Sequence, residues 1–153
     1  MFRKIIALFM ALIIHYANLS PGAYGRLYIP SVGISVQLYE TVNGDHKAQG
    51  YVDAWDSAAY RISHKGGCGF IADHYNQGFI DIKNCEVGCF CYIISENGVE
   101  VFKCVKTTNG RNDGSNLYTA DGEKLSDIDY ADFACYTCDG NWQNVYMIFF
   151  KRF

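Results

Sequence analysis

The segment 90–106, FCYIISENGVEVFKCVK, restricts the fold of this chain more than any other stretch. Its two arms are rich in aromatic and β-branched residues, which favour strands. Between the arms, Asn97-Gly98 is the signal for a two-residue type I′ turn. The segment therefore predicts a β-hairpin in which Glu96 lies opposite Val99.

The same register places Cys91 opposite Cys104. Cross-strand partners at such a position are close enough for a disulfide, so we expect these two cysteines to be in contact. A disulfide and a pair of packed thiols are both compatible with this spacing. The chain has seven cysteines, and because seven is odd, at least one thiol stays free or bonds another molecule.

The rest of the chain also predicts short strands separated by turns. Apolar residues alternate after Pro30, a short helix is expected at Asp56–Tyr60, and a helical turn is expected at Phe79–Cys85. The polar segment 107–130 predicts a long loop, either irregular throughout or with a short helix in it. The remaining strands are expected at Cys68–Ala72, 132–138 and 144–153, and one face of the first strand should carry Val32, Ile34, Val36 and Leu38.

No long amphipathic helix and no internal repeat is evident in the sequence. Twelve Tyr, ten Phe, fifteen Gly and only two Pro favour sheet and turns. We therefore expect one mainly-β domain over residues 26–153, folded as a closed or nearly closed barrel.

The N-terminal segment, residues 1–25, has the features of an export signal. A basic start, MFRK, precedes ten apolar residues at Ile5–Ile14, which span about 15 Å as a helix. Ala23-Tyr24-Gly25 fits a small-x-small cleavage site, with Arg26 as the mature start. The alternative is an uncleaved membrane anchor that extends to Leu19. Either interpretation predicts an exported domain.

The charge of the chain argues against a nucleic-acid partner. The formal net charge is −3, the isoelectric point is about 5.7, and there is no run of basic residues. Nothing in the sequence calls for a cofactor.

Cys138 is the cysteine with the widest range of possible roles, because it follows Cys135 with two residues between. A zinc site would need a second such pair, which the sequence lacks, and residues three apart on a strand point to opposite faces. A thioredoxin-like role would place the pair at a helix N-terminus, whereas this pair ends a strand. We therefore expect no metal site in this chain and favour a nucleophile at Cys138.

A cysteine nucleophile needs an acid or base, usually a histidine. His15 lies in the export segment, and His46 and His64 lie in polar, turn-like surroundings. His74 follows the apolar run 70–72 by two positions, at a strand end, where active groups are common. An exposed loop histidine is the alternative interpretation of His74.

Several segments, in order, resemble the sortases, the exported cysteine transpeptidases of Gram-positive bacteria. LYIPSVGISVQLYE is similar to the I-P-x-x-G-(I/V)-x-V opening strand of that family. FIADHYNQGFIDIKNCEVGCFCYI is similar to the segment that carries the family histidine, and ISENGVEVFKCVK to the following hairpin. CYTC is similar to the T-L-x-T-C strand end, whose last residue is the nucleophile.

The resemblance implies an eight-stranded barrel with Cys138 as nucleophile and His74 as acid. Its substrate would be a peptide or protein with a sorting signal of the LPxTG kind, cleaved through a thioacyl intermediate. An amine at the cell surface, or water, would then resolve that intermediate. Asp73 and Asp139 flank the two residues in sequence and are candidates for tuning the histidine.

The sequence departs from the family at one position. Sortases carry an arginine at the start of the last strand, but this strand is expected to begin at Asn144, and Arg152 lies near its far end. Asn144 is the expected neutral substitute as an oxyanion donor, and Arg61 or Arg111 could reach in from loops. This departure leaves a second function open, that of an inactive, extracellular peptide-binding domain.

Overall fold

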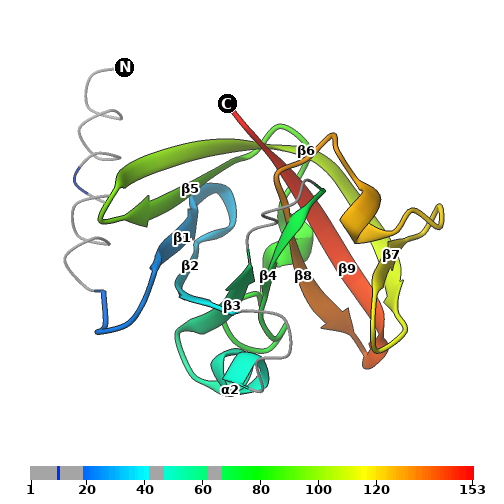
Figure 1. Cartoon of the computed structure of the whole chain (residues 1–153). Coiled ribbons are helices and arrows are strands. Elements are labelled where there is room, and N and C mark those ends of the chain that lie inside the picture. Colours follow the sequence, from blue (N-terminus) through cyan, green and yellow to red (C-terminus); the bar gives the residue numbers. More distant parts are fainter. Residues whose placement is uncertain (1–9, 11–18, 42–46, 62–66) are drawn as a thin grey trace.

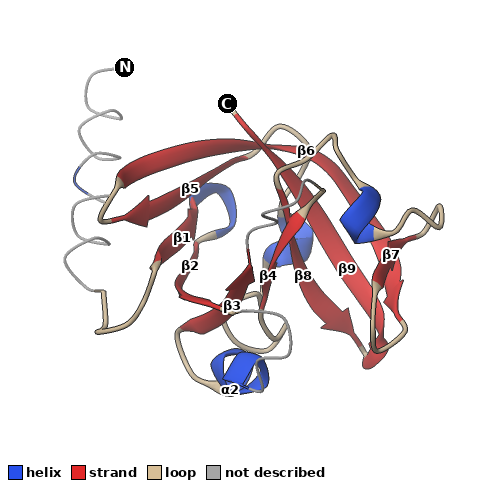
Figure 2. Cartoon of the chain, in the orientation of Figure 1, coloured by secondary structure: helices blue, strands red, loops and turns tan. Residues whose placement is uncertain are grey.

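The computed structural model describes Met10 and residues 19–41, 47–61 and 67–153. These residues form a mainly-β domain with a few short helical segments (Figures 1 and 2). The strands are β1 (Gly25–Ile29), β2 (Ile34–Glu40), β3 (Ser57–Arg61), β4 (Gly69–Ala72), β5 (Phe90–Ser95), β6 (Gly98–Asn112), β7 (Leu117–Thr119), β8 (Phe133–Asp139) and β9 (Asn141–Arg152). The helical segments are η1 (Pro30–Val32), α2 (Lys47–Asp53), η2 (Ile82–Asn84) and η3 (Leu125–Asp127).

Eight of the strands close into a barrel, as expected from the sequence. Their order is β5-β1-β2-β3-β4-β8-β9-β6, and a further pairing of β5 with β6 closes the ring. Strand β7 extends the sheet beyond β6, outside this ring. Most pairings are antiparallel, but β2 with β3 and β4 with β8 are parallel.

The barrel interior is filled by one face of each strand. Ile34, Val36 and Leu38 on β2 are all buried, which confirms the period-two prediction for that strand. Val32 instead ends η1, because Pro30 begins a helical turn there and Gly33, at φ 67°, reverses the chain into β2.

A second apolar cluster lies on the opposite face of β4, β8 and β9. Ala134, Val145, Met147 and Phe149 point to this side, and Leu125 and Ile128 from the η3 region cover them. The segment after β7 therefore packs on the outer face of the barrel wall. It is part of the folded structure and not the long irregular loop that residues 107–130 predict.

A buried ion pair fixes the start of β1 to the turn before β3. The Arg26 guanidinium donates to both carboxylate oxygens of Asp56, at 2.9 and 2.8 Å, and Gln37 Nε2 donates to Asp56 Oδ2 at 3.0 Å. Asp56 has a φ of 54°, a conformation that Asp tolerates better than most residues. These contacts position the crossover that makes β2 and β3 parallel.

The predicted hairpin is present, but the predicted register is wrong by two residues. Ser95 pairs with Gly98, so the turn residues are Glu96 and Asn97, and Cys91 lies opposite Phe102. Cys91 and Cys104 are both free thiols. The disulfide joins Cys85 to Cys89 instead, with an S–S distance of 2.07 Å.

Three other expectations need correction. The helix expected at Asp56–Tyr60 is strand β3, and the helix nearby is α2, which ends at Asp53. The segment 107–130 contains the end of β6, all of β7 and η3. The last strand begins at Asn141, not at Asn144, because a tight turn around Gly140 joins it directly to β8.

The helical turn expected at Phe79–Cys85 is present as η2. Most of the expected export segment lies outside the described residues. Within the described part of the chain, no helix combines the length and the apolar character that a membrane crossing requires.

We predict that Asp56→Asn lowers the free energy of unfolding by about 2 kcal/mol, because it leaves the buried Arg26 guanidinium without a charged partner. The control is Glu100→Gln, which breaks the more exposed pair with Arg152 and should cost less than about 1 kcal/mol. Urea unfolding of both variants measures the difference. Equal losses would show that the Arg26–Asp56 pair does not anchor the crossover.

Candidate active site

The parallel pairing of β4 with β8 brings His74 and Cys138 to the same end of two adjacent strands. Ala72 pairs with Tyr136, and the Asp73 N–H donates to the Tyr136 carbonyl at 3.4 Å. Ala72 and Tyr136 are the last pair of this ladder, and His74 and Cys138 each lie two residues beyond them. Because side chains alternate along a strand, Cys138 lies on the same face of β8 as Tyr136, and His74 follows the end of β4 at the same end of the sheet.

Cys138 is a free thiol near the end of β8, and it is partly buried. Its partner on β9 is Val145, a member of the outer apolar cluster. Burial raises the pKa of the Cys138 thiol, so the neutral form is favoured in the protein without substrate. Cys135 points to the barrel interior and is fully buried, so the two cysteines lie on opposite faces of β8.

His74 is held from helix α2 by a carboxylate. Its Nε2 lies 2.8 Å from Asp53 Oδ1, and Gln77 Nε2 donates to the Val52 carbonyl at 2.8 Å, which ties the same loop to α2. The hydrogen bond with His74 lowers the pKa of Asp53, so that carboxyl is ionised at neutral pH. An ionised carboxylate accepts the Nε2 hydrogen, which leaves Nδ1 of His74 for a thiol or a leaving group.

Asp73 is a buried carboxyl next to the histidine. Its Oδ1 accepts the His74 N–H at 2.7 Å, whereas Oδ2 is buried without a hydrogen-bond partner. Burial raises the pKa of Asp73 to about 7, more than the bond from His74 lowers it. Asp73 therefore shapes the backbone at His74 and changes its charge close to neutral pH.

Asp139 directly follows Cys138 and forms an ion pair across the site. Its Oδ1 accepts from Lys83 Nζ at 2.6 Å, and the Lys83 ammonium also lies 5.9 Å from the centre of the Tyr146 ring. Lys83 belongs to η2, in the same connection that begins with His74. The ion pair thus links the end of β8, just after Cys138, to η2 in the segment that follows His74.

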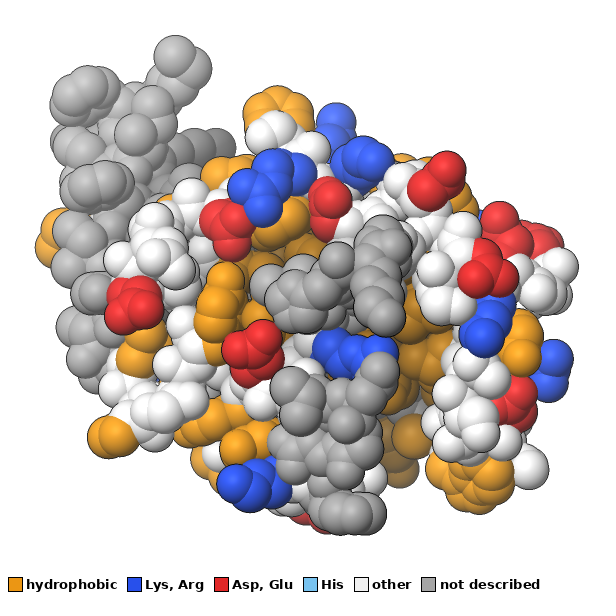
Figure 3. Space-filling view, viewed as in Figure 1, with side chains coloured by type: hydrophobic (Ala, Val, Ile, Leu, Met, Phe, Trp, Pro, Cys, Tyr) orange, Lys and Arg blue, Asp and Glu red, His pale blue; other side chains and the backbone are white. Residues whose placement is uncertain are grey.

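A pocket of about 310 Å³ lies on the same face as Cys138. It is bounded by β4 and β8 on one side and by the segment around β7 and η3 on the other, and Figure 3 shows a hollow with an apolar floor there. Its lining includes Arg61, Phe70, Asn112, Asn116, Leu125 and Tyr136. Tyr136 is the same-face neighbour of Cys138 on β8, so the pocket and the thiol share one face of this strand.

The pocket has aromatic walls and two cationic side chains in its lining, Arg61 and Lys124. The Arg61 guanidinium lies 5.8 Å from the centre of the Phe70 ring, and Phe70 packs edge-on against Tyr136 with ring centres 5.9 Å apart. Elsewhere on the face drawn in Figure 3, cationic and anionic side chains are interspersed. The pocket therefore offers aromatic surface together with charged and hydrogen-bonding side chains.

The three candidates for the oxyanion donor lie in different places. Asn144 pairs with Arg111 on β6, and by alternation both side chains belong to the face opposite to Val145 and Cys138. The Arg111 guanidinium stacks on Tyr118, 4.2 Å from the ring centre. Arg61 ends β3 and lines the pocket, so both arginines are on strands and not on the loops that the sequence predicts.

Sequence analysis missed Asp53, because it lies 21 residues before His74 and nothing local connects the two. Its only signal is its place at the end of a helix that the sequence did not predict. His46 and His64 lie outside the described residues, so their predicted solvation stays a prediction.

Comparison with known proteins supports the fold. No family model matches this chain, and no curated protein matches it. Solved structures do match. Sortase C1 of Streptococcus agalactiae, in its complex with MTSET, has 15% identity and a TM-score of 0.63, and the match covers 86% of this chain and 68% of that one.

Two further structures show the same likeness. Sortase C from Clostridium perfringens SM101 has 16% identity and a TM-score of 0.60, with 88% of this chain and 72% of that chain covered. Sortase C2 of Group B Streptococcus Pilus Island 1 has 13% identity and a TM-score of 0.63, with 88% and 76% covered. This chain therefore has the sortase fold, a closed eight-stranded barrel, as the sequence resemblance predicts.

We predict that the Asp73 carboxyl lowers the free energy of unfolding by about 4 kcal/mol as the pH rises from about 4 to about 7. The unfolded carboxyl ionises near pH 4, whereas the folded one resists ionisation until about pH 7. Stability from this group is thus fully present below pH 4 and is lost as the pH rises through the folded pKa.

Asp73→Asn should remove this loss, because the amide oxygen can still accept the His74 N–H and carries no charge. Urea unfolding of both proteins at about pH 4.5 and pH 8 measures the effect. If the two proteins lose stability equally over this range, Asp73 is not the group responsible.

Proposed function

We propose that the protein is a sortase-like cysteine transpeptidase, with Cys138 as nucleophile and His74 as acid and base. The observation that carries the proposal is the parallel register of β4 and β8: His74 follows the end of β4 by two residues and Cys138 lies near the end of β8, so both residues lie at the same end of two adjacent strands. The thiol is free, and Tyr136, its same-face neighbour on β8, lines the pocket. The sortase fold agrees with this assignment at the level of architecture.

The reaction is an acyl transfer in two halves. The Cys138 thiolate attacks the carbonyl carbon of the scissile Thr–Gly bond in a sorting-signal peptide, and the tetrahedral intermediate expels the amine. His74 gives the proton that this amine needs to leave. In the second half an amine at the cell surface attacks the thioester, His74 takes its proton, and the sulfur leaves as thiolate.

Asp53 acts through His74 and does not touch the substrate. By accepting the Nε2 hydrogen it fixes the ring and its tautomer, and it stabilises the imidazolium that receives the Cys138 proton. This stabilisation offsets the burial that raises the pKa of the thiol. The residues of the substrate before the scissile bond would lie in the pocket against Phe70 and Tyr136.

We expect a neutral or main-chain oxyanion donor. Arg111 stacks on Tyr118, and Arg61, although it lines the pocket, lies level with Ala134, four residues before Cys138 on β8. Asn144 is one candidate, provided that its amide reaches around the start of β9. Asn112 is a second candidate, because it lines the pocket and its Oδ1 already accepts the Gly114 N–H. A neutral donor stabilises an oxyanion less than a charged fork, so we expect a slow enzyme.

We also propose that the domain works outside the membrane, after export by residues 1–25 as a cleaved signal or as an anchor. The support for this is the basic and apolar pattern of that segment.

A peptide-binding domain without catalytic activity is the alternative function. Two observations favour it: burial holds the Cys138 thiol in its neutral form, and no arginine shares its face at the same end of β8. The pocket would then hold a peptide without cleaving it. The two functions differ in whether a covalent adduct forms.

We predict that incubation with a library of sorting-signal peptides produces a thioacyl adduct on Cys138, detected by mass spectrometry of the intact protein and of its fragments. Cys138→Ala should abolish the adduct. His74→Ala should slow its formation about 100-fold or more, because the amine then leaves without a proton donor.

The matched control is Cys91→Ala, which removes a buried free thiol from the barrel interior and should leave the adduct intact. Peptide binding without any adduct would support the alternative function. An adduct that survives Cys138→Ala would contradict the assignment of the nucleophile.

We predict that Asp53→Asn slows adduct formation about tenfold and shifts its pH profile, because the amide no longer stabilises the imidazolium. Asp53→Glu should restore part of the rate. Gln49→Ala is the control, since it removes another partner of Asp53 without touching the histidine. An unchanged pH profile in Asp53→Asn would contradict a positioning role for this carboxylate.

A further inference from the structure

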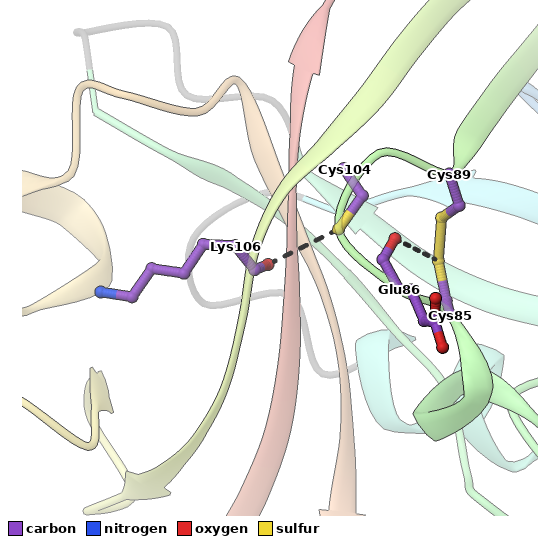
Figure 4. Close-up of a disulfide and its surroundings, with 5 residues drawn as sticks. All are labelled: Cys85, Glu86, Cys89, Cys104 and Lys106. Carbon is purple, nitrogen blue, oxygen red and sulfur yellow. Dashed lines mark hydrogen bonds between the residues drawn. A yellow bond between two sulfur atoms is a disulfide. The ribbon is translucent and has the colours of Figure 1, made fainter.

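Three cysteine sulfurs gather at the interior apolar cluster of the barrel: Cys85 and Cys104 belong to this cluster and Cys89 packs against it. The Sγ atoms of Cys85, Cys89 and Cys104 all lie within 4.8 Å of one another (Figure 4). Cys85 and Cys89 are joined as a disulfide, and Cys104 beside them is a free thiol. A lone disulfide needs no third sulfur, so the cluster requires an explanation.

The main chain brings the three residues together through local structure. Cys85 directly follows η2, and its N–H donates to the Ile82 carbonyl at 3.1 Å. The Cys89 N–H donates to the Glu86 carbonyl at 3.0 Å, which turns the chain back on itself. Cys104 on β6 donates its N–H to the Cys89 carbonyl at 2.8 Å. The three positions thus depend on a turn and on a strand, not on the disulfide alone.

The surroundings of the sulfurs suit thiols as well as a disulfide. The Cys104 thiol donates to the Lys106 carbonyl at 3.8 Å, and the Glu86 carbonyl oxygen lies 3.9 Å from Cys85 Sγ (Figure 4). Cys85 and Cys104 are almost fully buried, whereas Cys89 is only partly buried. The cluster therefore has a closed inner side and one side that is open to solvent.

Three thiolates in this arrangement match the requirements of a zinc-type cation. Zinc–sulfur bonds of about 2.3 Å place the sulfurs of one site roughly 3.8 Å apart, within the spread of this cluster. Cys85 and Cys89 have the short spacing of paired ligands, and Cys104 comes from a neighbouring strand, as in zinc sites built from a turn and a second element. A divalent ion also offsets more of the buried negative charge than a monovalent ion does.

We propose that, when its disulfide is reduced, the protein binds one soft divalent d¹⁰ cation, Zn²⁺ or its probe Cd²⁺, through Cys85, Cys89 and Cys104. The fourth coordination position lies on the open side, next to Cys89, and is taken by water or another exogenous ligand. Disulfide and metal are alternative states of the same sulfurs. The site is independent of Cys138 and its proposed function.

The chemistry balances with a named reductant. A phosphine donates two electrons to the Cys85–Cys89 disulfide and leaves as its oxide with an oxygen from water, and two protons from that water complete the thiols. Binding of the cation to three thiols then releases three protons, so the affinity rises with pH.

The test uses the full chain, reduced with a phosphine and titrated with Cd²⁺ or Zn²⁺ against a chromophoric chelator. We expect one ion per chain, a thiolate-to-Cd²⁺ absorption band, and protection of Cys85, Cys89 and Cys104 from alkylation in the metal-bound form. Cys104→Ser should weaken binding at least about 100-fold, more than the loss of an outer supporting residue costs. Oxidised wild-type protein should not bind the ion.

Two controls distinguish loss of the metal ligands from a general effect on the protein. Cys68→Ser removes a buried thiol outside the cluster and should leave the affinity unchanged. Because Cys104→Ser could disturb the core, circular dichroism of its oxidised form checks the fold, and Cys89→Ser, at the partly exposed position, should weaken binding equally. The proposal is overturned if reduced wild type and both cluster variants bind the ion alike, or if Cys138→Ala is the substitution that abolishes binding.

Discussion

The parallel pairing of β4 with β8 is the contact on which the rest of this site depends. It joins segments far apart in sequence, and a one-residue slip would turn either His74 or Cys138 to the opposite face. The register is held by burial on both sides: the barrel interior packs against Ile71 and Cys135, and the outer cluster packs against Ala134. Apolar packing therefore fixes the relative position of two polar groups.

Much of the fold could be predicted from the sequence because the side chains of a strand alternate between its two faces, which gives apolar residues a period of two. The alternation at Ile34, Val36 and Leu38 and the turn signal near Asn97 were sufficient to indicate a barrel of hairpins. The exact register was not predictable, because a shift of two residues keeps every side chain on its face. For that reason the pattern alone could not distinguish Phe102 from Cys104 as the partner of Cys91.

The candidate site could be predicted only in part, for a related reason. Cys138 and His74 have local motifs, and the sortase resemblance connects them. Asp53 has no local signal, because its role depends on where helix α2 packs. The cluster of Cys85, Cys89 and Cys104 was equally hidden, since a turn and a distant strand create it in three dimensions.

The central claim is that Cys138 and His74 lie close together. The most direct test is whether modification of Cys138 changes the NMR resonances of the His74 ring. NMR spectra of the histidine rings, with His74 assigned through His74→Gln, can be compared before and after Cys138 is blocked as a methyl disulfide. We predict that the His74 ring resonances shift more than those of any other histidine, and that Cys138→Ala removes the response to the reagent. Unchanged His74 resonances on complete modification of Cys138 would contradict the account.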